Sequence, residues 1–283
     1  MKVRDLLVYA TSRLRAADIE NAPRDARALV ADVICRSKDQ IILSAIESVT
    51  QRERDLLTSH LDRRITGCPV SRILGRRLFW GREFKINDNV IDPRGDTETL
   101  VALALERPAA RILDLGTGSG VIAISLAAEW PSAEVIASDV SEAALKIATE
   151  NARTHGVRER CSFLLSDWYS EIKGTFDLII SNPPYVTQKS MKTLPLEYKH
   201  EPTIALSSGR NGLNHIKKIL HQAGRYLTSK GQLIVECGHN KGALENAFPS
   251  VPFTWIMTKT STSSVFLLSK EDLDITNFPD NNV

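Results

Sequence analysis

The first 65 residues carry apolar side chains at helical spacing, with polar residues between them. Pro23 suits the first turn of a second helix, Asn21 stands ahead of it as a candidate cap, and Gly67 and Pro69 end the pattern. We therefore expect a small helical bundle over residues 1–75. The recurring apolar positions are Leu6, Leu7, Ala10, Leu14, Ala28, Leu29, Val33, Leu56, Leu57 and Leu61.

Between residues 76 and 93 the pattern changes to an alternation of apolar and polar positions, LFWGREFKINDNV, around Gly81. Such alternation predicts a β-hairpin, here as a linker between two domains. The sequence DTETLVALALE then opens with helix-capping residue types and continues with apolar periodicity, so a new helix begins a third segment, residues 94–283.

Beyond Ala110, short apolar runs alternate with helical patterns. This alternation predicts a Rossmann-like α/β fold with a mostly parallel sheet covered on both faces. The segment FTWIMTKTSTSSVFLLSK predicts two strands joined by a polar turn, and a terminal antiparallel hairpin distinguishes a class I methyltransferase sheet from a dinucleotide-binding fold. Only the tail FPDNNV is expected to fray. The five earlier strands are RILDLG, EVIASDV, CSFLLSD, FDLIISN and QLIVECG.

Charge limits the class of partner. The formal net charge is only +2, whereas proteins that grip bare nucleic acid by its phosphates carry a strongly basic surface. Local basic clusters at Arg63-Arg64, Arg72 and Arg76-Arg77 fit a solvated helix face as well as a contact with RNA or an acidic protein.

Cysteine spacing and the N-terminal sequence bear on metals and location. Cys35, Cys68, Cys161 and Cys237 lack the spacing of a zinc site, so we expect no metal and free thiols in a reducing compartment. The first 20 residues carry charges every few positions and match neither a signal peptide nor a membrane span. A cytoplasmic protein without membrane contact is the expectation.

A glycine-rich loop, DLGTGSG, follows a buried strand and opens a helix. At this edge of an α/β sheet, backbone N–H groups face a ligand, and glycine permits a close approach. NAD-binding proteins use a similar loop, but a carboxylate directly before the glycines repels a pyrophosphate and suits the cationic amino acid end of S-adenosyl-L-methionine. The residues expected to bind this cofactor are Asp114, Gly116, Thr117, Gly118, Ser119 and Gly120.

Acidic residues also follow the second and third strands. Asp139 lies about 20 residues beyond the loop, where a carboxylate accepts from both ribose hydroxyls. Asp167 and Trp168 follow the third strand, where we expect the carboxylate to accept from the adenine amine and the indole to pack on its ring. Trp168 fits a rim or core aromatic as well.

The motif Asn182-Pro183-Pro184-Tyr185 follows the fourth strand, beside the glycine loop. An amide or aromatic amine nitrogen is a poor nucleophile because its lone pair is delocalised. The Asn182 side-chain oxygen and the Pro183 carbonyl can accept from both of its N–H bonds, on a turn that two prolines make rigid, and Tyr185 offers a ring for stacking. We predict that these four residues are catalytic in methyl transfer to a planar nitrogen; a rigid turn alone is the plain alternative.

These segments together resemble the release-factor glutamine methyltransferases of the HemK/PrmC type over nearly the full chain. The resemblance is carried by the helical N-terminal domain and by PVSRILGRRLFWGREFKI, PRGDTETLV, DLGTGSGVIAISLA, SNPPY, EPTIALSSGRNGL and QLIVECGHN. It implies that Gly116 to Gly120, Asp139, Trp168 and Asn182 contact the cofactor, and that Asn182 to Tyr185 hold the substrate.

The resemblance also implies an activity. The enzyme would be an S-adenosylmethionine-dependent protein-(glutamine-N5) methyltransferase that modifies the Gly-Gly-Gln motif of peptide-chain release factors, tunes translation termination and yields S-adenosyl-L-homocysteine. The helical domain would dock the release factor, and we expect a monomer. Two alternatives are a methyltransferase acting on an exocyclic amine of DNA or RNA, which shares the NPPY motif, and a non-catalytic S-adenosylmethionine-binding module.

Three parts of the sequence depart from the family pattern. Asp92-Pro93-Arg94-Gly95 stands where Ile-Pro-Arg-Pro is usual, and Gly95 should loosen that hinge. Arg72 replaces an aromatic residue or histidine, and TSTSSVF lacks a common glycine and arginine. These changes concern the docking surface and substrate choice and leave the chemistry intact.

Overall fold

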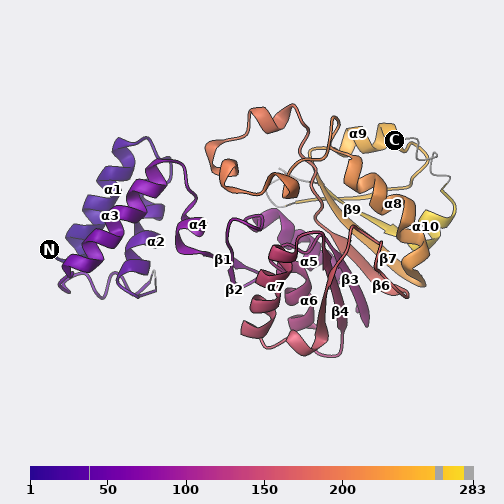
Figure 1. Ribbon diagram of the computed structural model, residues 1–283, viewed down its shortest axis with the longest axis horizontal. Coiled ribbons are helices and arrows are strands. Elements are labelled where there is room, and N and C mark those ends of the chain that lie inside the picture. The colour runs from indigo at the N-terminus through magenta and orange to yellow at the C-terminus, as the bar shows by residue number, and fades with distance from the viewer. Residues whose placement is uncertain (38, 259–263, 277–283) are drawn as a thin grey trace. The chain divides into compact units, whose positions relative to one another are not determined.

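The computed structural model describes residues 1–37, 39–258 and 264–276, and the chain forms two compact units (Figure 1). The N-terminal unit comprises Met1–Arg76 together with Pro195–His200. The larger unit comprises Arg77–Leu194 and Glu201–Val283. The polar turn predicted between the last two strands and the tail FPDNNV lie mostly or wholly outside the described residues.

The N-terminal unit is a bundle of helices, with bounds α1 Val3–Ala16, α2 Ala22–Val33, α3 Gln51–Ile65 and α4 Val70–Leu74. The predicted apolar stripes meet in its core, where Leu6, Leu14, Leu29 and Leu61 are fully buried. Leu56 is an exception because it points outward and is 43% exposed. The apolar periodicity therefore predicted the core face correctly at most positions.

Local details of this unit differ from the sequence prediction. Asn21 stands at the N-cap of α2, but its side chain makes no capping hydrogen bond. The five-residue helix α4 was not predicted, because so short a segment shows no periodicity. Arg72 lies in α4 and is buried, so neither a solvated face nor a contact with RNA or an acidic protein applies to it.

The predicted hairpin is confirmed as β1 (Arg76–Phe79) paired with β2 (Arg82–Lys85). Trp80 and Gly81 both have positive φ, at 49° and 69°. Two successive positive φ values are typical of the type I′ turn, whose twist matches that of the flanking strands.

The predicted fold class is confirmed in the larger unit, which contains a seven-stranded sheet in the order β5-β4-β3-β6-β7-β9-β8. Strands β3 to β7 are parallel, and β9 pairs antiparallel with both β7 and β8. The bounds are β3 Arg111–Leu115, β4 Glu134–Asp139, β5 Cys161–Leu165, β6 Phe176–Ser181, β7 Leu227–Gly238, β8 Thr254–Met257 and β9 Ser264–Ser269.

Helices cover both faces of this sheet (Figure 1). Neighbouring residues of β3 show the two faces: Ile112 packs in one core with α5, α6 and α7, whereas Leu113 packs in a second core with α8, α9 and α10. The bounds are α5 Glu98–Ala104, α6 Val121–Glu129, α7 Glu142–Thr154, α8 Asn214–Tyr226, α9 Lys241–Ala247 and α10 Lys270–Asp274. The last of these helices was not predicted.

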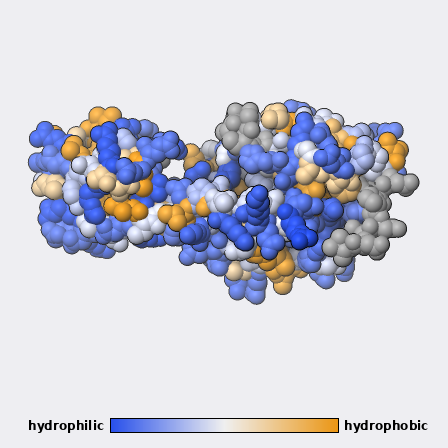
Figure 2. All heavy atoms as spheres, turned by 90° about the horizontal axis from the view of Figure 1, so that it is seen from above, coloured by the Kyte–Doolittle hydropathy of each residue, from blue (hydrophilic) through white to orange (hydrophobic). Residues whose placement is uncertain are grey.

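Hydrophilic residues cover most of the surface seen in Figure 2, and hydrophobic residues gather there only in small groups. Within the described ranges, no helix is both long and apolar enough to cross a membrane. All four cysteines are free thiols, as expected, and only Cys35 is exposed.

Candidate active site

The glycine loop and the Asn-Pro-Pro-Tyr motif meet at one edge of the sheet. Strands β3 and β6 are parallel neighbours, with Leu115 opposite Ser181, and the Ser181 hydroxyl donates to the Leu115 carbonyl at 2.7 Å. Because parallel strands end at the same edge, residues that follow each strand lie side by side. The predicted proximity of the two motifs is confirmed.

Close packing explains the last glycine of the loop. Gly120 has φ 82°, and a Cβ placed on it would lie 2.8 Å from Ile124 Cδ1 and 3.1 Å from Ala148 Cβ. A side chain at this position would therefore push α7 away from the start of α6. In contrast, a Cβ on Gly118 would meet nothing within 4 Å, so the loop is open on that side.

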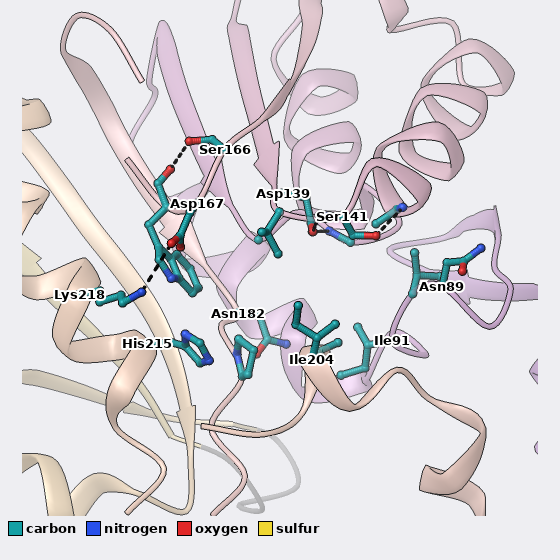
Figure 3. Close-up of a pocket in the computed structure, with 18 residues that line it drawn as sticks. Asn89, Ile91, Asp139, Ser141, Ser166, Asp167, Asn182, Ile204, His215 and Lys218 are labelled. Atoms are coloured by element: carbon teal, nitrogen blue, oxygen red, sulfur yellow. Dashed lines mark hydrogen bonds and ion pairs between the residues drawn. The ribbon is translucent and has the colours of Figure 1, made fainter. Parts of the chain in front are cut away.

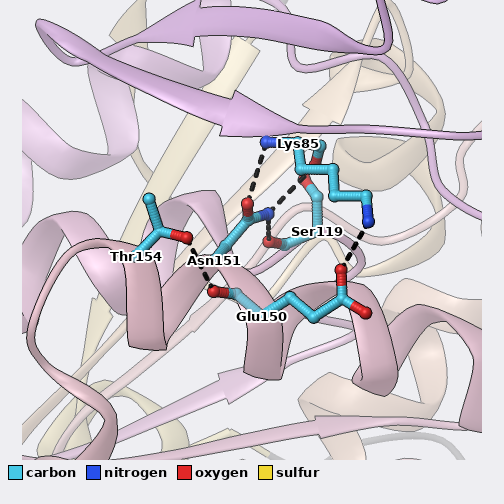
Figure 4. Close-up of polar contacts among 5 residues, drawn as sticks. All are labelled: Lys85, Ser119, Glu150, Asn151 and Thr154. Carbon is cyan, nitrogen blue, oxygen red and sulfur yellow. Dashed lines mark hydrogen bonds and ion pairs between the residues drawn. The ribbon is translucent and has the colours of Figure 1, made fainter.

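The Asn151 side chain holds the glycine loop by hydrogen bonds (Figure 4). Its Nδ2 donates to the Ser119 carbonyl at 2.8 Å and to the Lys85 carbonyl at 3.0 Å, while its Oδ1 accepts from the Lys85 N–H at 2.8 Å. The side chain is buried. One amide on α7 thus joins the glycine loop to strand β2.

Asp114 lies beneath the loop, fully buried. Its Oδ2 accepts from the Thr117 hydroxyl at 2.6 Å. Burial raises the pKa of Asp114 to about 7, against the opposing hydrogen bonds from Thr117 and the Ala123 N–H. Asp114, Thr117, Ser119 and Gly120 do not line the neighbouring cavity, so their predicted contact with a cofactor stays a prediction.

Asp139, at the end of β4, faces the loop. Its Oδ2 accepts from the Gly118 N–H at 2.8 Å, and its Oδ1 accepts from the Ser141 N–H at 2.9 Å. Burial raises the pKa of this carboxyl, and these backbone hydrogen bonds oppose the shift. Each oxygen retains a lone pair for a ligand hydroxyl.

A cavity of about 310 Å³ opens at this edge of the sheet (Figure 3). Seven predicted site residues line it: Gly116, Gly118, Asp139, Asp167, Trp168, Asn182 and Pro184. The other lining residues are Asn89, Val90, Ile91, Val140, Ser141, Ala144, Ser166, Ile204, Ala205, His215 and Lys218. Its mixture of apolar walls and a few polar groups is typical of a small-molecule site.

One wall of the cavity combines an indole with a cation. Trp168 lies against Gly116, and its ring centroid is 5.3 Å from that of His215 on α8. Lys218 Nζ lies 3.7 Å from Asp167 Oδ2. Burial lowers the pKa of His215, which favours the neutral form of this ring.

The Asn-Pro-Pro-Tyr motif divides between the cavity and the interior. Asn182 and Pro184 line the cavity, whereas Pro183 is buried. Asn182 Nδ2 donates to Thr97 Oγ1 at 2.9 Å. The Tyr185 hydroxyl donates to Glu236 Oε1 at 3.1 Å, and its ring packs against Gly238. The predicted stacking of a substrate on Tyr185 stays a prediction.

Several residues of this site were missed from the sequence. His215 and Lys218 are three residues apart on α8, a spacing that would have placed them on one face had the helix been assigned to the site. Ile204 and Ala205 come from the segment EPTIAL, which resembles the family pattern but suggested no role in the site. Thr97 and Glu236 carried no chemical signal that separated them from ordinary polar residues.

The fold and site together define a class of protein. The sheet order, the terminal antiparallel hairpin and the glycine loop after β3, at the switch between β3 and β6, are those of a class I S-adenosylmethionine-dependent methyltransferase. Solved structures at low identity agree in fold. A methyltransferase from Pyrococcus furiosus matches with a TM-score of 0.52 and 15% identity, over 78% of this chain and 99% of its own. The hMettl16 catalytic domain matches with a TM-score of 0.53 and 15% identity, over 80% and 84%.

Sequence comparison identifies the family within this class. Residues 5–75 match the PrmC N-terminal domain, and residues 91–197 match the methyltransferase small domain. A release factor glutamine methyltransferase from Cereibacter sphaeroides is 41% identical over 86% of this chain and 87% of its own. A ribosomal protein uL3 glutamine methyltransferase from Neisseria meningitidis serogroup B is 36% identical over 96% and 94%. The chain belongs to the family of release-factor glutamine methyltransferases of the HemK/PrmC type.

Proposed function

We propose that this chain transfers a methyl group from S-adenosyl-L-methionine to the side-chain amide nitrogen of a protein glutamine, in the Gly-Gly-Gln motif of peptide-chain release factors. Relatives at 38–41% identity that bear the name release factor glutamine methyltransferase support this substrate. The N-terminal unit docks the protein substrate in this proposal. Ile42, Leu43 and Ile46, each more than 70% exposed, give it an apolar surface for that purpose.

The residues that line the cavity fit S-adenosylmethionine. Gly116 and Gly118 form an open cradle, Asp139 offers two carboxylate oxygens for ribose hydroxyls, and Trp168 supplies an aromatic wall for adenine. The cofactor supplies an electrophilic methyl group. The chain itself has to hold the acceptor nitrogen in line with that methyl group and exclude water.

The orientation of the Asn182 amide is the single observation that carries the proposal. Its Nδ2 donates to Thr97, and no described residue donates to its Oδ1. The residue lines the cavity, so Oδ1 is the acceptor available to a ligand there. An amide nitrogen whose N–H donates to a fixed acceptor is a better nucleophile, because the acceptor stabilises the positive charge that develops on the nitrogen as it is methylated.

Ribosomal protein uL3 is the second candidate substrate. The uL3 glutamine methyltransferase of Neisseria meningitidis aligns with 96% of this chain, more than the 86% covered by the Cereibacter relative. The acceptor is again a glutamine amide, so the same site chemistry applies. The choice between the two proteins therefore depends on docking.

Ion pairs argue against a nucleic-acid amine as the acceptor. Arg64 pairs with Asp25 at 2.7 Å and with Glu197 at 2.9 Å, and Arg76 pairs with Asp32 at 2.7 Å. Two of the five arginines of the basic clusters are thereby paired with carboxylates, which weakens the attraction of the clusters for phosphates.

A labelling experiment tests the proposal. Purified enzyme with methyl-labelled S-adenosylmethionine should label unmodified release factor, and mass spectrometry should find one added CH₂ on the Gly-Gly-Gln peptide. A release factor with glutamate in place of that glutamine is the matched control and should stay unlabelled. Recombinant uL3 and RNA are tested in parallel. Label on uL3 alone would reassign the substrate, and label on RNA alone would refute glutamine methylation.

The same labelling assay tests the role of Asn182 in methyl transfer. Asn182→Ala should abolish transfer while the affinity for S-adenosylhomocysteine, measured by calorimetry, falls by less than about tenfold, since most of the residues proposed to contact the cofactor are other ones. Full transfer by this variant would remove Asn182 from the mechanism.

A further inference from the structure

A buried chain of hydrogen bonds runs from the sheet to the acceptor amide. Glu236 on β7 is fully buried, and its Oε2 accepts from the Thr97 hydroxyl at 2.9 Å. Thr97 is also buried, and its Oγ1 accepts from Asn182 Nδ2 at 2.9 Å. Three residues that are far apart in sequence are thus joined by hydrogen bonds that end at the cavity.

The direction of this network follows from the chemistry of its members. The Thr97 hydroxyl donates to one oxygen of Glu236 and the Tyr185 hydroxyl donates to the other, so both oxygens of this carboxyl serve as acceptors. A hydroxyl has a single hydrogen, so Thr97 can only accept from its other neighbour. That neighbour must present its NH₂ group, and the Asn182 oxygen is turned away from Thr97. The reversed amide would set two acceptor oxygens against each other.

The other oxygen of Glu236 holds the end of the same motif. Its Oε1 accepts from the Tyr185 hydroxyl at 3.1 Å, while Asn240 Nδ2 donates to the Tyr185 carbonyl at 2.7 Å. A Cβ on Gly238 would lie 2.5 Å from the Tyr185 ring, so only glycine allows this ring to pack here. Glu236 therefore contacts, directly or through Thr97, both ends of the Asn-Pro-Pro-Tyr turn.

We propose that Glu236 and Thr97 are positioning residues that fix the Asn182 amide with its oxygen toward the acceptor nitrogen. The inference rests on the proposed function, because it assigns the oxygen a substrate to accept from. It predicts that the hydroxyl of residue 97 matters for turnover, and that the size of that side chain alone does not suffice.

Two matched variants separate the hydroxyl from the shape. Thr97→Val keeps the branched shape and removes the hydroxyl, whereas Thr97→Ser keeps the hydroxyl. Thr97→Val should lower kcat about tenfold or more, because the Asn182 side chain is then free to rotate and its oxygen has to be oriented during the reaction. KM for the protein substrate and the Kd for S-adenosylhomocysteine should change less than about twofold, and Thr97→Ser should keep kcat within about threefold of wild type.

A spectroscopic measurement reads the amide itself. In ¹⁵N-labelled protein, the side-chain NH₂ signals of Asn182 are assigned by their loss in Asn182→Asp. Thr97→Val should shift these signals, and Thr97→Ser should leave them near their wild-type positions. Glu236→Gln tests direction separately, because a glutamine amide can either accept from Thr97 or donate to it. The Asn182 amide can then adopt two orientations, so its NH₂ signals should split or shift. If only half of the enzyme molecules hold the Asn182 oxygen toward the substrate, kcat should fall about twofold.

The outcomes distinguish this inference from the proposed function. Wild-type enzyme that methylates neither release factor nor uL3 would refute the proposed function. Even then, the NH₂ signals of Asn182 in the Thr97 variants would show whether Thr97 fixes the Asn182 amide. Unchanged Asn182 signals in folded Thr97→Val, or equal losses of kcat in Thr97→Val and Thr97→Ser, would refute the positioning role. Glu236→Gln with wild-type signals and kcat would refute control of direction by the carboxylate.

Discussion

Asp114→Asn should change how the stability of the methyltransferase unit depends on pH. Burial raises the pKa of Asp114 from 3.8 to about 7 in the folded protein. Between these values the folded state keeps a proton on the carboxyl that the unfolded state has released. The stability that this proton contributes is complete below about pH 4 and is lost as the pH rises to about 7.

The size of the effect follows from the shift. At most one proton is involved, so the free energy of unfolding should fall by up to about 1.4 kcal/mol per pH unit within this range, and by about 4 kcal/mol over all of it. Asparagine has nearly the same shape, can still accept from Thr117 and does not titrate. Asp114→Asn should therefore remove this slope. Compared with the wild type at the same pH, the variant should be more stable above pH 7 than it is below pH 5.

Denaturant unfolding followed by tryptophan fluorescence is a suitable assay. Trp80, Trp130, Trp168 and Trp255 all lie in the larger unit, so their fluorescence reports on that unit alone. The difference in unfolding free energy between the variant and the wild type is measured from about pH 5 to about pH 8, so that groups common to both proteins cancel. Two parallel curves over this range would show that Asp114 stays ionised and would refute the reasoning.

Further predictions concern the loop, the cofactor and docking. Gly118→Ala should lower the free energy of unfolding by about 1–2 kcal/mol because of the positive φ at this position. Gly120→Ala should lower it by about 1–3 kcal/mol more, since the added Cβ would collide with neighbouring side chains. Equal losses of stability for the two variants in thermal unfolding would contradict this packing. Asp139→Ala, which leaves the Gly118 and Ser141 N–H groups without their acceptor, should weaken S-adenosylhomocysteine binding about tenfold or more in calorimetry; unchanged affinity would remove Asp139 from the cofactor site. Leu43→Asp should raise KM for the protein substrate and leave cofactor affinity unchanged, and equal kinetics to wild type would exclude this surface from docking.

Much of the site could be predicted from the sequence because it depends on local chemistry. Parallel strands end at one edge of a sheet, so the glycine loop after β3, Asp139 after β4 and Asn182 after β6 had to lie close together. Residue types in these short segments also indicated the ligand they suit. The cores of both units likewise followed from the period of apolar residues, apart from positions such as Leu56.

Other features depend on contacts between distant segments, and periodicity contains no information about those. Arg72 lies in a five-residue helix whose burial is decided by the surrounding bundle. His215 and Lys218 reach the cavity only because α8 packs beside the turn that carries Asp167 and Trp168. No pattern in the sequence indicated either result.

The sequence by itself determined the fold class, the edge of the sheet where chemistry occurs and the residues that follow each strand, since these depend on spacing along the chain. Only the tertiary structure decided which atoms of those residues are available. Asp114 is buried beneath its loop, where it accepts from the Thr117 hydroxyl. Asn182 presents one end of its amide because its Nδ2 donates to Thr97, which in turn donates to Glu236. Thr97 and Glu236 come from other parts of the chain, and they fix a side chain that local sequence leaves free to rotate.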